Sequence, residues 1–297
     1  MVQELPCFSI VIPTYRRPQR LGACLQALAR LNYPRDRFEA IVVDDGSESP
    51  PEPVVGSYQG QIDVKLLSQH HAGPAAARNT GAARAKGDFL AFTDDDCAPD
   101  PGWLQALAAH FAAVPDHLIG GRTLNALPDN PYSTASQSLI SYLYSYYDSN
   151  PNDARFFASN NLAVATASFH AIGGFDTTYT LAASEDREFC DRWRYYGYHM
   201  SYAPAAMVYH AHALTLRSYW RQHFNYGCGA AQFHAARALR DRQGIKLEPP
   251  SFYINLLYYP FTQGIGWRAP LQSLLLLISQ IAHTLGYFRE RARRQRS

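Results

Sequence analysis

An alternation of short apolar runs and helix-type segments in the N-terminal third constrains the fold more than any other feature. The apolar runs that read as strands lie at residues 8–15, 40–43, 64–67 and 89–92. Between them, residues 18–31 carry leucines at helical spacing, and residues 73–87 are rich in alanine. Because strands that alternate with helices favour right-handed βαβ units, the pattern predicts a parallel sheet flanked by helices.

Acidic residues follow two of these runs directly. Asp44 and Asp45 follow the second run, and Asp94, Asp95 and Asp96 follow the fourth. If strand geometry continues beyond the fourth run, Asp94 and Asp96 point to one face and Asp95 to the other. Two converging carboxylates at the carboxyl ends of parallel strands suit a hard divalent cation shared with phosphate. We therefore predict a nucleotide site there; the alternative is that the aspartates only form turns.

Further motifs follow in order along the chain. They lie at residues 9–15, 42–47, 73–79, 94–96, 161–164, 173–176 and 185–186. In this order, over about residues 7–212, they resemble the motifs of the family 2 glycosyltransferases. The resemblance implies an α/β protein of the GT-A fold, with a mostly parallel central sheet flanked by helices. It also implies inverting transfer of a hexose-type sugar from a nucleotide-diphosphate sugar to an acceptor hydroxyl, with a divalent metal, Mn²⁺ or Mg²⁺.

The resemblance assigns roles on the donor side to single residues. Asp96 is expected to ligate the metal, Asp94 to share it or reach the donor ribose, and His210 to be a further ligand. An imidazole ligand favours a transition metal such as Mn²⁺. The residues expected to bind the nucleotide sugar are Pro13, Thr14, Tyr15, Asp45, Arg78, Asn79, Asp94 and Asp95, with Asp45 at the base and Arg78 at the diphosphate. The alternatives are an ordinary Asp-Gly turn after residue 45, a solvated Arg78 and a structural His210.

The catalytic acids are expected at residues 185–186. Inversion requires a base opposite the leaving group, and in the family pattern the second acid has this role. Asp186 is therefore the predicted base and Glu185 its supporting acid. Both begin a predicted helix that ends near Tyr196, with Ser184 as a candidate cap; a role confined to the helix dipole is the alternative. By the same resemblance, Asn161 and Gly174 belong to the acceptor side.

The family pattern becomes weak after about residue 212, which divides the chain into a catalytic domain, residues 1–215, and a helical extension, residues 216–297. Residues 271–288 would span roughly 27 Å as a helix, marginal for a bilayer core of about 30 Å. Their polar residues fall in one arc beside a broad Leu/Ile face, and five arginines follow. This pattern predicts a helix that lies in the plane of a membrane surface. The alternative is a helix docked on the catalytic domain.

Composition narrows the location and the partners. The net charge of +2 gives no nucleic-acid footprint. The five cysteines are scattered without metal-ligand spacing, and no signal peptide is recognised, so we expect a cytoplasmic enzyme, at the cytoplasmic face of the membrane if the helix binds there. By resemblance, the donor base is uracil, the acceptor is a carbohydrate or lipid-linked, and the pathway makes cell-surface polysaccharide or glycolipid. The alternatives are a nucleotide-sugar-binding protein without transfer activity and a sugar nucleotidyltransferase.

Overall fold

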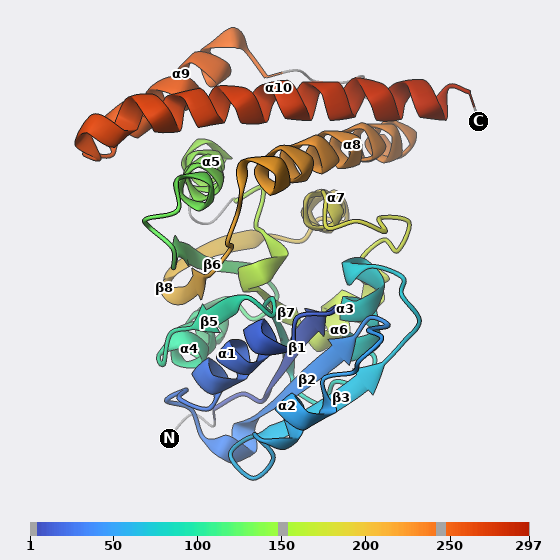
Figure 1. The fold of residues 1–297 in the computed structure, drawn as a ribbon. Coiled ribbons are helices and arrows are strands. Elements are labelled where there is room, and N and C mark those ends of the chain that lie inside the picture. The colour runs from blue at the N-terminus through green and yellow to red at the C-terminus, as the bar shows by residue number, and fades with distance from the viewer. Residues whose placement is uncertain (1–4, 148–153, 242–247, 297) are drawn as a thin grey trace. The chain divides into compact units, whose positions relative to one another are not determined.

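The computed structural model describes residues 5–147, 154–241 and 248–296, which form two compact units (Figure 1). The sheet unit comprises Met1–Leu124, Tyr147–Thr180 and Asp186–Ala211, and the helical unit comprises Asn125–Tyr146, Leu181–Glu185 and His212–Ser297. The division expected from the sequence, 1–215 and 216–297, assigns residues 125–146 and 181–185 to the catalytic domain. In space these two segments cluster with the C-terminal helices.

The sheet unit is built on one eight-stranded sheet with the order β3-β2-β1-β4-β7-β6-β8-β5. The strands are β1 Phe8–Thr14, β2 Phe38–Asp44, β3 Asp63–Ser68, β4 Phe89–Phe92, β5 Cys97–Pro99, β6 Leu118–Asn125, β7 Leu162–Ala165 and β8 Met200–His210. The first four strands in this order are parallel, as predicted. β7 is antiparallel to both β4 and β6, and β5 is antiparallel to β8. The sheet is therefore mixed, with a parallel half that carries the βαβ units.

Helices cover both faces of the parallel strands. The helices of this unit are α1 Pro18–Leu28, α2 Glu52–Gly56, α3 Pro74–Ala82, α4 Trp103–Ala113, α6 Thr166–Ala171 and α7 Glu185–Tyr195, with 3₁₀ turns η1 Arg35–Arg37 and η2 Ser159–Asn161. Ile10 and Ile12 face the main core with α1 and α4, whereas Val43 of β2 faces α3. A Cβ at Gly81 of α3 would lie 2.5 Å from a methyl of Val11. The small residues of α3 therefore allow it to lie close against the sheet.

The helical unit contains four long helices and the 3₁₀ turn η3 Gly266–Arg268. The helices are α5 Pro131–Tyr147, α8 Leu216–Asp241, α9 Pro250–Thr262 and α10 Ala269–Arg294. α8 and α10 run side by side (Figure 1), and a Cβ at Gly227 of α8 would lie 1.9 Å from the carbonyl oxygen of His283. Gly286 of α10 approaches the Phe224 carbonyl in the same way. Glycine is required where these two backbones meet.

The helix α10 buries part of its polar arc together with Leu275 and Leu276, and exposes a row of other apolar side chains. Gln272 and Ser279 are buried inside the helical unit. An outward stripe of Leu271, Leu274, Leu277, Ile281, Leu285 and Phe288 is between 42% and 57% exposed. By length and composition, the segment Gly266–Arg294 is also the one described helix that could cross a membrane.

Candidate active site

The aspartate triplet lies in a turn at the carboxyl end of β4. The strand ends at Phe92, and the backbone N–H of Cys97 donates to the carbonyl of Asp94 at 3.1 Å before β5 begins. Extended geometry therefore does not continue through the triplet, and the alternation expected for Asp94, Asp95 and Asp96 does not apply. The Arg17 guanidinium lies near both Asp95 and Asp96, but the other partners of the three carboxylates differ because the chain turns here.

Asp95 connects the turn to the first strand. Its buried carboxylate accepts hydrogen bonds from Thr14 Oγ1 at 2.7 Å and from the Arg17 guanidinium at 3.3 Å. Burial raises the pKa of Asp95 to about 6, with smaller increases from the neighbouring carboxylates, while Arg17 and Thr14 oppose the rise. Thr14 and Asp95 are both predicted to bind the donor, and in the structure they are hydrogen-bonded to each other.

Asp96 and His210 form the pair that suits a metal. The Nε2 atom of His210, at the end of β8, lies 3.2 Å from Asp96 Oδ1, while Arg20 donates to Asp96 Oδ2 at 2.9 Å. Burial disfavours a charged His210, but the hydrogen bond and charge of Asp96 outweigh it, so the pKa of His210 is raised. A carboxylate oxygen beside an imidazole nitrogen is a donor set that fits Mn²⁺. Asp94 contacts Arg78 at 2.8 Å instead.

Asp45 organises the segment that leads into α3. Its carboxylate accepts hydrogen bonds from the backbone N–H groups of Ala72 and Gly73, both at 2.9 Å, and from the Gln69 amide at 2.7 Å. The His71 Nδ1 atom lies 2.9 Å from the same carboxylate. The ring of His71 stacks on Tyr15, with centroids 4.3 Å apart. Tyr15 follows Pro13 and Thr14 at the end of β1. Through the His71 ring it is linked to the Asp45 carboxylate.

Asn79 and Gly174 belong to one local structure. The Asn79 amide donates to the carbonyl of Phe175 at 2.8 Å and accepts from its N–H at 2.9 Å. Gly174 has a φ of 67°, and a Cβ there would lie 2.6 Å from Asn79 Oδ1. Arg192 of α7 donates to the carbonyls of Ile172 and Gly174, each at 2.6 Å. The turn after α6 is therefore fastened both to α3 and to α7.

Asn161 is a buried junction within the sheet unit. Its carbonyl oxygen accepts from the Trp103 indole at 2.9 Å, and its amide donates to the carbonyls of Arg122 at 3.1 Å and Ala206 at 2.9 Å. These bonds join α4, β6 and β8. The side-chain amide of Asn161 therefore makes hydrogen bonds to three protein groups.

The predicted catalytic acids begin α7, which starts at Glu185. Glu185 is buried, and the Asp186 carboxylate accepts from the N–H of Arg187 at 2.8 Å. The preceding Ser184 has a φ of 69°, in the left-handed region, whereas an N-cap residue is usually extended. Among the described residues, Ser184 and Arg16 are the only non-glycine residues with a positive φ. Such backbone strain clusters at functional sites.

A family model described as Glycosyl transferase family 2 matches residues 9–224. The chain belongs to glycosyltransferase family 2. The pre-mycofactocin glycosyltransferase of Mycobacterium tuberculosis H37Rv is 32% identical over 235 residues, which cover 75% of this chain and 46% of that protein. The hyaluronan synthase of Pasteurella multocida is 29% identical over 68% of this chain and 24% of its own length. The chain spans about half the length of the first of these relatives.

Solved structures agree on the fold of this family 2 glycosyltransferase. The mannosyltransferase PcManGT of Pyrobaculum calidifontis, in complex with GDP-Man and Mn²⁺, has a TM-score of 0.64 at 20% identity, over 99% of this chain and 81% of that one. S. aureus TarS 1-349 in complex with UDP-GlcNAc has a TM-score of 0.56 at 19% identity, over 98% and 92%. The predicted GT-A fold is confirmed.

Four residues at this site have no role in the sequence predictions: Arg17, Arg20, His71 and Cys97. The sequence could have indicated a role for the two arginines. They lie at the start of a helix, where a positive charge is unfavourable to the helix dipole unless an anion lies nearby. Asp95 and Asp96 are those anions. For His71 and Cys97 only the tertiary structure reveals the neighbours.

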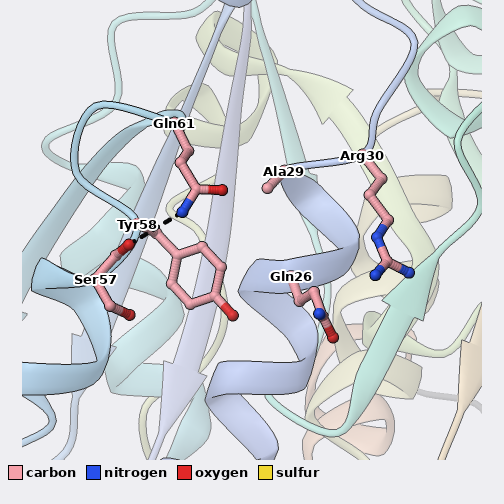
Figure 2. Close-up of a pocket in the computed structure, with 6 residues that line it drawn as sticks. All are labelled: Gln26, Ala29, Arg30, Ser57, Tyr58 and Gln61. Carbon is pink, nitrogen blue, oxygen red and sulfur yellow. Dashed lines mark hydrogen bonds between the residues drawn. The ribbon is translucent and has the colours of Figure 1, made fainter.

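A surface hollow lies elsewhere on the sheet unit (Figure 2). It is lined by Gln26, Ala29, Arg30, Ser57, Tyr58 and Gln61. α1 leads away from the carboxyl end of β1, and the hollow lies along the second half of that helix. It contains no carboxylate, and the described site residues take no part in it.

Proposed function

We propose that this chain transfers a sugar from a nucleotide-diphosphate sugar to an acceptor hydroxyl, with inversion and with a divalent metal. The observation that carries the proposal is the pairing of Asp96 with His210 in a family 2 fold, beside the ion pair of Asp94 with Arg78. The solved neighbours support a nucleotide-sugar donor, because two of them are complexes with GDP-Man and with UDP-GlcNAc.

On the donor side, Asp96 and His210 would hold the metal, with Asp94 sharing it or reaching the ribose. When bound, the metal neutralises the charge that develops on the leaving diphosphate. Arg78, which donates to Asp94 at 2.8 Å, would add a fixed positive charge for the same phosphates. Asp45 with Tyr15, Pro13 and Thr14 would hold the base, for which uracil is our proposal. Asp95 and Asn79 would support this side by positioning Thr14 and the turn at Gly174.

On the acceptor side, Asp186 would accept the proton of the acceptor hydroxyl in a single displacement, with Glu185 as the supporting acid. Its place in the first turn of α7 fixes the carboxylate on a helix that is itself fastened by Arg192. Asn161 and Gly174 would shape the acceptor side through the strands and the turn that they hold. We propose a carbohydrate or lipid-linked acceptor.

The helical unit would contact a membrane peripherally. The outward stripe of α10 is apolar, and α9 adds the exposed side chains of Tyr253, Ile254, Tyr258 and Phe261. Trp267, which is 82% exposed, lies between the two helices in sequence, and Arg291, Arg293 and Arg294 end α10. An apolar helix face with aromatic residues and arginines fits an anionic bilayer surface. We propose the cytoplasmic face of the membrane, and synthesis of cell-surface polysaccharide or glycolipid.

A thermal-shift panel tests the donor assignment. Uridine, guanosine and thymidine diphosphate sugars would be added with and without Mn²⁺, and the correct donor raises the melting temperature by an amount that grows with the logarithm of its excess over the dissociation constant. The proposal predicts one preferred base and a shift that requires the metal. Release of pyrophosphate would identify a nucleotidyltransferase, and a donor shift without any turnover would identify a binding protein.

A further inference from the structure

Cys97 lies directly beside the Asp96–His210 pair. In the antiparallel pairing of β5 with β8, Cys97 is the partner of His210. Directly opposed residues project from the same face of a sheet, with Cβ atoms about 4.5–5.5 Å apart. The backbone fixes the third member, because the N–H of Ala211 donates to the carbonyl of Asp96 at 2.8 Å. One ligand atom each of Asp96, Cys97 and His210 lies within 4.8 Å of the others.

We propose that Cys97 is a third ligand at this site and that the site therefore binds Zn²⁺ and Cd²⁺ through sulfur. The inference rests on the proposed function in one respect: Asp96 and His210 are also the residues proposed to hold Mn²⁺. One sulfur, one nitrogen and one oxygen donor form a set that suits Zn²⁺, with a fourth position left open. The metal–sulfur bond forms as the thiol proton leaves to solvent. Mg²⁺ and Mn²⁺, which prefer harder ligands than sulfur, gain little from the thiol.

The competing explanation is that Cys97 only fills the core. It is 1% exposed and belongs to the main hydrophobic cluster. The chain offers a matched control, because Cys24 of α1 is also 1% exposed in the same cluster and is not part of the ligand group. Replacing either thiol by alanine removes the same volume from the same core. Only the replacement of Cys97 removes a ligand.

Titration of the full chain with Co²⁺ and Zn²⁺, without donor or acceptor, tests the inference. Wild type and Cys24→Ala are expected to show a thiolate-to-cobalt charge-transfer band, and Cys97→Ala is expected to lack it. The Zn²⁺ dissociation constant should rise about tenfold or more in Cys97→Ala. The Mn²⁺ dissociation constant should change less than that of Zn²⁺. Thermal unfolding confirms that each variant is folded, and Cys97→Ser replaces Cys97→Ala if alanine destabilises the strand.

Two results would overturn the inference: Co²⁺ bound to wild type without the band, or an unchanged Zn²⁺ affinity when Cys97 is replaced. Failure of the proposed function looks different. Sugar transfer with Mn²⁺ but without the cobalt band would reject the thiol ligand alone. A cobalt band in a chain that transfers no sugar would reject the function and leave the thiol ligand in place.

Discussion

Asp95 and Asp96 both lie near the Arg17 guanidinium, but their other partners differ. Asp95 is bonded to Thr14 at the end of β1, and Asp96 faces His210 at the end of β8. At the scale of single residues, this difference separates the carboxylate that accepts from Thr14 from the one that we propose as a metal ligand. Two nearly isosteric substitutions can therefore distinguish them.

The first prediction compares Asp96→Asn with Asp95→Asn. Asp96→Asn removes a charged metal ligand, so the Mn²⁺ dissociation constant should rise about tenfold or more. Asp95→Asn preserves an acceptor for Thr14 and should change Mn²⁺ affinity by less. Calorimetric titration of Mn²⁺ measures both constants. Equal losses in the two variants would show that the turn, and not Asp96 itself, determines metal binding.

The second prediction concerns the base. Asp186→Asn should lower turnover by roughly 10²–10⁴-fold, because a positioned general base contributes about that much. Donor binding, measured by thermal shift, should not change, since the substitution leaves Asp96, Arg78 and Asp45 in place. Glu185→Gln is the matched comparison. A larger loss in Glu185→Gln than in Asp186→Asn would move the role of base to Glu185.

At the scale of elements, α8 carries a buried histidine that makes the helical unit sensitive to acid. His223 is 1% exposed, its Nε2 atom has no described partner, and it contacts the ring of Tyr219. Burial, with help from His283 and His212, lowers the pKa of His223 to about 3. The ring is therefore neutral in the folded chain over the whole neutral and weakly acidic range.

The third prediction follows from that shift. Between pH 6.5 and about 3 the unfolded chain binds a proton at His223 and the folded chain does not. The free energy of unfolding should therefore fall as the pH falls through this window, by at most about 1.4 kcal/mol per pH unit, and should be unaffected by His223 above it. Helix melting as a function of pH should show a flatter profile for His223→Gln. Identical profiles would mean that His223 is protonated in the folded chain.

The elements of the parallel half are predictable from the sequence because their burial follows local periodicity. The run at residues 89–92 coincides with β4, and residues 40–43 lie inside β2. The turn after β4 is not decided in this way: the sequence allows both a continued strand and an Asp turn, and Asp94 to Asp96 contain no glycine or proline to mark where the strand ends. The inward face of α10 is also hidden in the sequence. It combines Gln272 and Ser279 with Leu275 and Leu276, and Gly227 and Gly286 let the backbones of α8 and α10 approach closely.

For the whole molecule, the exposed stripe of α10 leads to a fourth prediction. The full chain should float with anionic liposomes, and salt should weaken this binding by screening the arginines. Leu274→Glu together with Leu277→Glu should abolish flotation, since both side chains face outward. Leu239→Glu is the control, because Leu239 of α8 is 87% exposed and lies outside the stripe.

A truncated chain, together with flotation, distinguishes a membrane-binding role of α10 from a role in holding the helical unit together. Deletion from Pro270 onward removes the partner that α8 contacts at Gly227, so the truncated chain is expected to sediment as aggregates. Flotation of both the wild type and the double glutamate variant would contradict a membrane role for the stripe. Absence of flotation in the wild type would do so as well.

The central claim, metal-dependent transfer from a nucleotide sugar, is tested most directly by the release of nucleoside diphosphate from the donor that stabilises the chain. We expect release with Mn²⁺, its loss on chelation, and its restoration when Mn²⁺ is returned. Asp96→Asn should show little release at the Mn²⁺ concentration that saturates wild type. Release that persists after chelation, and in Asp96→Asn as in wild type, would contradict the account.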